Sequence, residues 1–255
     1  MAYTTIEFYP GPRVSSIVLN RPPLNIINLE MLHELNEAWS EVEEIGSQVI
    51  VLTGAGKRAF SAGVDVADHS LDRVEPTLKA FHRLVLRICG SDCIVVAAIH
   101  GHTLGGGAEL AMVCDLIIAA EDTSIGQPEI ALGCFPPVAA AYLPRAIGVQ
   151  KAAEMVLLGE NISAAEAERV GMVNTVVAYD QLTVTVDDFV DRLLARSGAV
   201  LALTKRAIRE GWDHRFEKAL RRTEDLYLEK VTALEDMTEG MQAFLEKRQP
   251  NWKNK

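Results

Sequence analysis

The chain has 255 residues, 49% of them hydrophobic and 24% charged, with a formal net charge of −10. The length fits one large globular domain, or one domain with an appendage, and the acidic balance argues against nonspecific binding to nucleic acid. The N-terminal residues carry no secretory pattern, and no apolar run reaches the roughly 18 residues of a membrane span. We therefore expect a cytoplasmic protein that binds neither nucleic acid nor membrane.

The first half of the chain alternates between strand and helix patterns. Strands are expected at 4–9, 14–19 and 49–52, and the first two are separated by a Pro-Gly-Pro turn. Asn28 is a candidate N-cap for a helix that ends near Glu44. A second helix is expected over 74–89, with inward positions at Leu78, Phe81, Leu84, Val85 and Ile88. This alternation predicts an α/β domain with a largely parallel sheet.

Beyond Leu132 the pattern becomes mainly helical. Ser163, with Glu166 three residues later, has the spacing of a capping box. A short strand is expected over 173–177, and helices are expected over 138–148, 149–158, 181–195, 199–212, 215–230 and 234–248. We divide the chain into an α/β core, 1–195, and a helical region, 196–255. No Ser-, Gly- or Pro-rich linker separates them, so we expect one compact subunit.

The stretch from Ile94 to Gly133 contains the main candidate site. An apolar strand ends at Ile99, and three consecutive glycines precede Glu109, which begins an apolar helical run. Glu129 follows a second apolar strand at 116–120. Each glutamate alone is consistent with a helix-dipole or solvated role, but carboxylates in apolar surroundings usually have a partner or a function. Together the two could hold a water molecule and act as base and acid.

Two glycine-containing segments have the character of ligand-binding loops. The turn from Leu104 to Glu109 leads into a helix N-terminus, whose unpaired amides could bind a carbonyl or phosphate oxygen. It matches neither the GxGxxG fingerprint nor a P-loop. The second segment has the sequence AFSAGVD, at 59–65. From residue types alone, a purely structural turn and an ordinary connecting loop remain alternatives for these two segments.

These motifs, in this order, resemble the enoyl-CoA hydratase/isomerase, or crotonase, superfamily. The motifs are AFSAGVD and HGHTLGGGAELAMVCDLIIAAEDTSIGQPEIALG, and the resemblance covers nearly the whole chain. It implies a spiral of ββα turns with a helical C-terminal trimerisation region. It also implies a homotrimer or a homohexamer built as a dimer of trimers. The reaction would need no cofactor, because coenzyme A is part of the acyl-CoA substrate.

The resemblance also implies roles for individual residues. The backbone amides of Val64 and Gly106 would form an oxyanion hole for the thioester oxygen. Glu109 and Glu129 match the two hydratase glutamates, and having both favours hydration over double-bond isomerisation. Glu129 would transfer a proton to carbon and Glu109 would orient and activate water. Coenzyme A would bind near Ala62, Asp65, Pro23 and Leu24.

Two segments depart from the usual pattern of the family. The early loop RPPLNIINLEM is unusual, and the segment after Glu129 has Phe135, Pro136 and Pro137 where glycines are common. Both resemble the branch of the family that hydrates cyclohexa-1,5-diene-1-carbonyl-CoA in anaerobic benzoyl-CoA degradation, and a compact wall would suit a ring. The alternative is that this variation reflects packing. A short-chain enoyl-CoA hydratase or an enoyl-CoA isomerase of fatty-acid oxidation is the competing function, and a noncatalytic RNA-binding relative is disfavoured by the charge.

Several other groups are weaker candidates. His100 and His102 have no third ligand at a supportive spacing, so we expect no metal site. Asp65, Asp68 and His69 could line the coenzyme A entrance or lie in a solvated loop. Lys205 and Arg206 could contact coenzyme A phosphates, although an ordinary charged helix face is favoured. The cysteines, Cys89, Cys93, Cys114 and Cys134, match no zinc or redox pattern and are expected to be small core residues in a reducing compartment.

Overall fold

The structure is a computed structural model of the chain. It describes residues 3–70, 73–213, 230, 233–236, 239, 243 and 246–255. The helix expected over 215–230 lies outside the described residues except for its last position, and the one expected over 234–248 is described only in part. The boundary placed between 195 and 196 stays a prediction.

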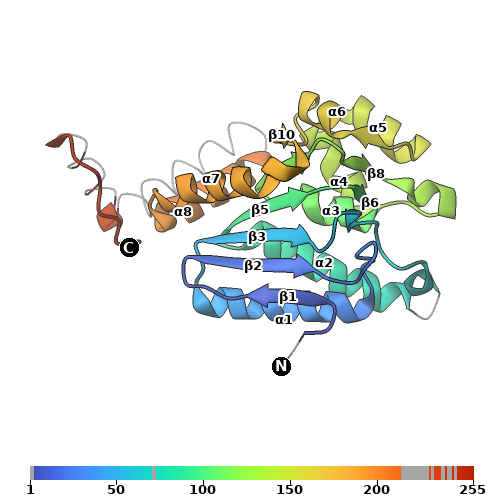
Figure 1. The fold of residues 1–255 in the computed structure, drawn as a ribbon, viewed down its shortest axis with the longest axis horizontal. Coiled ribbons are helices and arrows are strands. Elements are labelled where there is room, and N and C mark those ends of the chain that lie inside the picture. The colour runs from blue at the N-terminus through green and yellow to red at the C-terminus, as the bar shows by residue number, and fades with distance from the viewer. Residues whose placement is uncertain are drawn as a thin grey trace.

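The main sheet has six strands in the order β1-β2-β3-β5-β7-β10 (Figure 1). The β1 strand pairs antiparallel with β2, and all other neighbours are parallel. The largely parallel sheet expected from the sequence is therefore confirmed. The strands are β1 (Ile6–Tyr9), β2 (Val14–Leu19), β3 (Val49–Gly54), β5 (Ile94–Ile99), β7 (Leu116–Ala120) and β10 (Thr175–Val177).

A second, smaller sheet has the order β4-β6-β8-β9. Its members are β4 (Ala59–Ser61), β6 (His102–Leu104), β8 (Ser124–Gly126) and β9 (Ile162–Ser163). The β3, β5 and β7 strands of the main sheet are each followed by a strand of this sheet and then by a helix, which is the expected ββα spiral. The sequence did not predict these four strands, because two or three residues are too few to show an alternating pattern.

Helices cover both faces of the main sheet (Figure 1). The α1 and α2 helices pack together on one face, and α7 contacts β3, β5 and β7 on the other. The helices are α1 (Leu29–Ile45), α2 (Val74–Gly90), α3 (Gly106–Met112), α4 (Pro137–Ala146), α5 (Val149–Leu158), α6 (Ala164–Arg169), α7 (Leu182–Leu194) and α8 (Gly198–Asp213), with 3-10 turns η1 (Val66–His69), η2 (Pro128–Leu132) and η3 (Tyr179–Gln181). No helix among the described residues has the length and apolar character needed to cross a bilayer.

Two predicted helix starts are found as expected. The side chain of Asn28 accepts a hydrogen bond from the amide of Met31 at 3.0 Å and caps α1. Ser163 Oγ accepts from the amide of Glu166 at 3.2 Å. The reciprocal half of that capping box is replaced, because the Glu166 carboxylate pairs with Arg169 and Lys151. Local hydrogen bonding of this kind is what sequence patterns predict best.

The β5 strand is buried at all six positions and divides the core into two layers. Val95, Ala97 and Ile99 pack with the residues of α1 and α2. Val96 and Ala98 face the opposite side, where α7 contributes Leu182, Val186 and Val190. A strand covered on both faces shows a continuous apolar run rather than an alternation, which explains the sequence of 94–99.

A buried ionic cluster fastens α8 to the sheet. Lys205 is 5% exposed, and its Nζ lies 2.7 Å from Asp115 Oδ2 while donating to the carbonyls of Ile88 and Cys93. Lys205 therefore neither lies on an exposed charged helix face nor reaches coenzyme A phosphates, so both alternatives for it are wrong. Arg206 lies on the exposed side of α8 and pairs with Glu210.

Lys205→Met is expected to lower the free energy of unfolding by about 3 kcal/mol, because it removes one partner of a buried ion pair. Urea denaturation measures this loss. Arg206→Met, one position along the same helix, breaks only an exposed pair and should change stability little. Equal effects of the two substitutions would contradict the burial of this cluster.

Candidate active site

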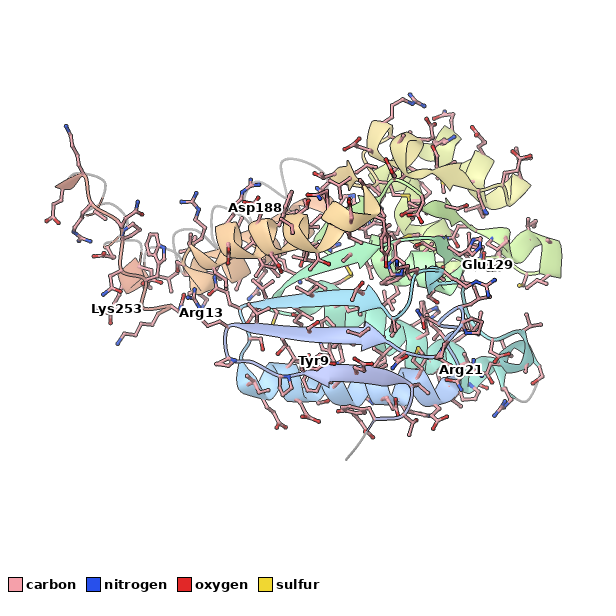
Figure 2. The ribbon with its side chains drawn as sticks, viewed as in Figure 1. Tyr9, Arg13, Arg21, Glu129, Asp188 and Lys253 are labelled. Atoms are coloured by element: carbon pink, nitrogen blue, oxygen red, sulfur yellow. The ribbon has the colours of Figure 1, made fainter. Side chains whose placement is uncertain are left out.

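A cavity of 310 Å³ lies beyond the carboxyl ends of the main-sheet strands, at the end of the sheet where Figure 2 labels Glu129. Ligands of parallel α/β sheets generally bind at this end. The cavity wall combines segments that are far apart in the sequence. It contains seven of the ten predicted site residues: Ala62, Val64, Gly106, Glu109, Glu129, Phe135 and Pro136.

The glycine turn brings two of these segments together. Gly105 is the N-cap of α3, with φ at 50°, a conformation that favours glycine. A Cβ atom at this position would lie 2.6 Å from Glu129 Oε1. The absence of a side chain at Gly105 therefore lets the Glu129 carboxylate approach the start of α3 closely.

Val64 and Gly106 lie on the same cavity wall. In the bridge between the two loops, the amide of Ile27 donates to the Gly63 carbonyl at 2.9 Å and that of Asp65 donates to the Ile27 carbonyl at 2.8 Å. The amide of Val64, between them, faces the other way, as in any extended segment. A Cβ built on Gly106 would lie 3.6 Å from the Val64 nitrogen. The backbone of Val64 therefore lies beside the start of α3, where the amide of Gly106 is one of the first helical donors.

Glu109 is a buried carboxyl group at the start of α3. It is 4% exposed, and its Oε1 accepts a hydrogen bond from the amide of Ala139 at 2.8 Å. Burial is the main cause that raises the pKa of Glu109, to about 7, and the charge of Glu129 raises it further. The amides of Ala139 and Val138 act in the opposite direction. Glu109 therefore exchanges its proton near neutral pH.

Glu129 is half-buried and lies in the first turn of η2, immediately after Pro128. Glu109 and Glu129 line the same cavity and influence each other electrostatically. The pair expected from the sequence is therefore brought together by the fold.

Three predicted binding residues lie beside the cavity rather than on its wall. The Leu24 carbonyl accepts from the amide of Ala62 at 3.0 Å, which places the early proline loop, with Pro23, behind the cavity loop. Asp65 pairs with Arg21 at 3.2 Å. Asp68, by contrast, is a buried wall residue, held by Arg73 and the amide of Leu29. The solvated-loop alternative is thus wrong for Asp68.

Comparison with known proteins agrees with this geometry. Residues 11–255 match the model of the enoyl-CoA hydratase/isomerase family. The chain belongs to the enoyl-CoA hydratase/isomerase family. A probable mitochondrial enoyl-CoA hydratase of Dictyostelium discoideum is 36% identical over 253 residues, covering 95% of this chain and 88% of the relative. The cyclohexa-1,5-dienecarbonyl-CoA hydratase of Thauera aromatica is 35% identical over 237 residues, which cover 93% of this chain and 92% of the relative.

Solved structures of the family have the same fold. The crystal structure of an enoyl-CoA hydratase from Bacillus anthracis superposes with a TM-score of 0.93, at 34% identity, and the match covers 99% of this chain and 100% of that one. The α/β fold class and the family resemblance are both confirmed. The prediction of a hydro-lyase of the enoyl-CoA hydratase type is confirmed at the level of the family.

The sequence missed one wall of the cavity. Val74, Thr77, Leu78 and Phe81 of α2 all line it. Leu78 was expected in the core, yet it is 37% exposed at the cavity. An amphipathic pattern shows which side of a helix is apolar, but it does not distinguish an apolar core from an apolar pocket. The exposed side chains of Val66, Leu132 and Phe135 add further apolar surface.

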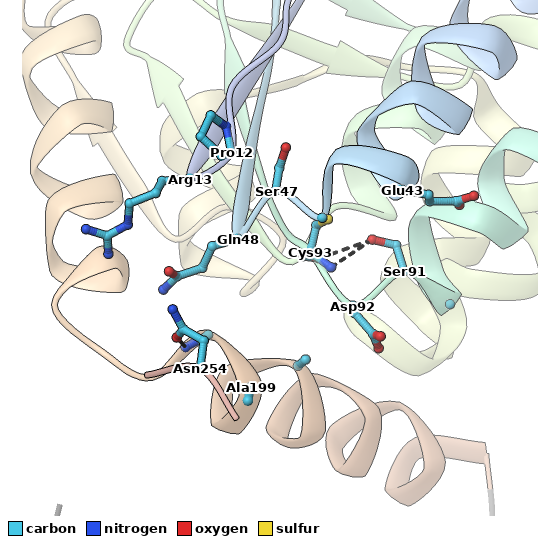
Figure 3. A pocket seen from close by; sticks show the side chains of 14 residues that line it. Pro12, Arg13, Glu43, Ser47, Gln48, Ser91, Asp92, Cys93, Ala199 and Asn254 are labelled. Carbon is cyan, nitrogen blue, oxygen red and sulfur yellow. Dashed lines mark hydrogen bonds between the residues drawn. The ribbon is translucent and has the colours of Figure 1, made fainter. Parts of the chain in front are cut away.

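A second cavity, of 580 Å³, lies at the opposite end of the sheet (Figure 3). Figure 2 labels Arg13 at that end. Its wall includes Ser91, whose Oγ accepts from the amide of Cys93 at 3.0 Å, and the acidic side chains of Glu43 and Asp92. Figure 3 shows that it is formed by loops before β2, β3 and β5, together with the start of α8. It contains none of the predicted site residues.

The described residues gather no group of three or more metal-ligating side chains. His100 is buried against Tyr179, and His102 is exposed at the start of β6. All four cysteines lie in the described part of the chain and are free thiols, two buried and two half-buried. The absence of a metal from the reaction stays a prediction.

The raised pKa of Glu109 predicts a pH-dependent stability. The pKa of this carboxyl is about 4.3 in an unfolded chain and about 7 in the fold. The folded state therefore binds the proton more tightly, and the stabilisation is present below about pH 4 and is lost as pH rises to about 7. The loss amounts to about 4 kcal/mol.

Urea unfolding from pH 5 to 8 tests this prediction. Glu109→Gln has no proton to lose, so the difference in stability between it and the native chain should grow in favour of the variant as pH rises. Glu121→Gln changes an exposed glutamate and should keep the native pH dependence. Parallel curves for the native chain and Glu109→Gln would show that Glu109 titrates normally.

Proposed function

We propose that this chain adds water to the double bond of an unsaturated acyl-CoA thioester in the 310 Å³ cavity. The observation that carries the proposal is that two carboxyl groups line the same cavity as the neighbouring backbone of Val64 and Gly106. The amides suit a thioester oxygen that gains negative charge, and the carboxyl groups suit a water molecule and the double bond. The cavity is lined mainly by apolar side chains, as an acyl group requires.

The amides of Val64 and Gly106 are proposed to form the oxyanion hole. The oxygen of the attacking water bonds to the β-carbon as the water loses a proton. The electrons of the double bond then move toward the thioester carbonyl. Two N–H donors at that oxygen stabilise the resulting enolate. Loss of one such donor typically costs about 3 kcal/mol of transition-state stabilisation.

The two glutamates are proposed to exchange protons with the substrate and water. Glu109, when ionised, takes a proton from water as the oxygen bonds to the β-carbon. Glu129, when protonated, gives a proton to the α-carbon. The substrate has then gained one water, and transfer of the proton from Glu109 to Glu129 restores the starting state of the pair. The raised pKa of Glu109 supports a pair that holds one proton between two carboxyl groups near neutral pH. No cofactor other than the coenzyme A of the substrate takes part in this scheme.

The proposed acyl group is the ring of cyclohexa-1,5-diene-1-carbonyl-CoA. Phe135, Pro136 and Pro137 form one wall of a small cavity, and prolines hold the backbone of that wall in place. The Thauera aromatica relative bears the name of this activity, but a crotonyl-CoA hydratase of Syntrophomonas wolfei is similar at 34% identity. A short-chain enoyl-CoA is therefore the second candidate substrate.

Assays with cyclohexa-1,5-diene-1-carbonyl-CoA and with crotonyl-CoA, in water labelled with ¹⁸O, test both the type of reaction and the choice of acyl group. Hydration incorporates ¹⁸O into the product, whereas the product of isomerisation carries no label. We expect labelled product and the larger kcat/KM for the cyclic thioester. Fast turnover of crotonyl-CoA alone would contradict the cyclic substrate, and unlabelled isomer would contradict hydration.

The homotrimer or homohexamer stays a prediction that sedimentation can test.

A further inference from the structure

The α4 helix begins without a cap of its own. Its N-cap position is Pro136 and its first residue is Pro137, so no side chain at the N-cap accepts from the first amides. Proline is favourable at the first helical position, but the amides of the second and third residues still need acceptors. A second proline, Pro144, lies in the last turns and cannot donate to the carbonyl of Ala140. This ten-residue helix therefore depends on contacts from other elements.

Glu109 supplies the missing cap from another helix. Its Oε1 accepts from the amide of Ala139, the third residue of α4, at 2.8 Å, and it also interacts with the amide of Val138. These are the positions that an N-cap side chain normally satisfies. The candidate catalytic carboxylate and the start of α4 thus fix each other, and a displacement of α4 would move the hydrogen bond on Glu109.

One turn further along, α4 is tied to the other end of α3. Arg209 of α8 donates to Tyr142 Oη at 3.2 Å. The same guanidinium donates to the carbonyl of Val113, the C-cap of α3, at 2.9 Å and pairs with Asp115 at 3.2 Å. The α3 and α4 helices are therefore bridged at two points, by Glu109 at one end and by Arg209 at the other.

We propose that Tyr142 and Arg209 are positioning residues for Glu109, which hold the first amides of α4 on its carboxylate. Neither residue lines the 310 Å³ cavity, so they act through the helix and not through contact with substrate. The role in the reaction rests on the proposed function of Glu109, but the effect on its protonation does not. Because the amides stabilise the ionised form, a looser α4 makes Glu109 hold its proton more tightly.

Other charged and titratable groups face these residues, and they remain in place in the variants that test the proposal. The groups on the cavity wall are Asp68, Glu129 and Cys134, and those around Arg209 and Tyr142 are His82, Cys89, Asp115, Arg145 and Lys205.

Infrared spectroscopy of the protonated carboxyl band of Glu109, identified by its loss in Glu109→Gln, gives a titration that needs no substrate. Tyr142→Phe and Arg209→Met are each expected to move the midpoint upward by about 0.5 to 1 pH unit. Arg209→Lys, which keeps the charge, should recover part of the shift. Tyr142→Phe removes only one hydroxyl group, so it still tests the proposal if Arg209→Met does not fold.

Two matched controls separate positioning from general loss of contacts. Tyr3→Phe removes a tyrosine hydroxyl that binds Glu41 on α1, and Arg206→Met removes an exposed arginine of α8. Both should leave the midpoint of Glu109 unchanged. An unchanged midpoint in folded Tyr142→Phe and Arg209→Met would overturn the proposal, whatever the activity. A shifted midpoint in a protein that hydrates no thioester would support the positioning role and contradict the proposed function instead.

Discussion

Glu129→Gln is expected to lower kcat for hydration by about 10²–10⁴-fold, the usual contribution of a general acid or base. Glutamine keeps the size and the hydrogen-bonding shape of the side chain, so the cavity should still bind the thioester. The expected result is therefore a loss in kcat with little change in the Kd for a saturated acyl-CoA. Turnover assays and isothermal titration calorimetry measure the two quantities separately.

Glu109→Gln is expected to cause a loss of similar size for a second reason. Its amide oxygen can still accept from the amide of Ala139, which preserves the start of α4. The proton exchange near neutral pH disappears, however, because the group that titrates at about 7 is gone. The acidic limb of the pH–rate profile should vanish with it.

Exposed Glu121 provides the control for both variants, since Glu121→Gln should retain native kcat. If the two carboxyl groups acted independently, the fold-loss in kcat of a Glu109/Glu129 double variant would equal the product of the two single losses. Because they are proposed to act as a pair, we expect the double variant to lose less than that product. Near-native rates in both single variants would reject a two-carboxylate mechanism.

The sequence was most informative where a pattern is local or where a chemical motif is long. The cap at Asn28 and the helix boundaries of α1 follow from hydrogen bonds within a few residues, and both were predicted correctly. The pairing of Glu109 with Glu129 was predicted because each lies in an unusually apolar segment. The chain between them forms β7 and β8, the two strands of one ββα turn, and only the family resemblance anticipated that arrangement.

Long-range partners explain what the sequence did not show. Lys205 has the spacing of an ordinary charged helix face, and nothing near it in sequence indicates that Asp115 and two carbonyls surround it. Leu78 likewise belongs to an apolar stripe that fits a core as well as a pocket. The trans cap of α4 by Glu109 joins residues 30 positions apart. Contacts of this kind depend on tertiary packing, which local propensity does not encode.

Gly106→Ala is expected to lower kcat/KM by about 10²–10³-fold, the effect of losing one oxyanion-hole donor. A Cβ at this position would lie 2.6 Å from Val64 Cγ2, which is closer than side chains approach. We expect the Val64 side chain to push its loop aside, which moves the amide of Val64 out of the proposed oxyanion hole. Gly90→Ala, where a Cβ meets nothing within 4 Å, should keep native kinetics.

A second substitution distinguishes this displacement from a general defect of the helix. Val64→Ala removes the methyl group that the new Cβ meets but leaves the backbone amide in place, so alone it should cost little in kcat/KM. In the Gly106→Ala/Val64→Ala double variant the collision is absent, and most of the lost activity should return. Such a recovery is a coupling between two residues in direct contact, which a double-mutant cycle measures. A double variant as slow as Gly106→Ala would mean that the glycine is needed for another reason, and that the two amides do not act together on the thioester oxygen.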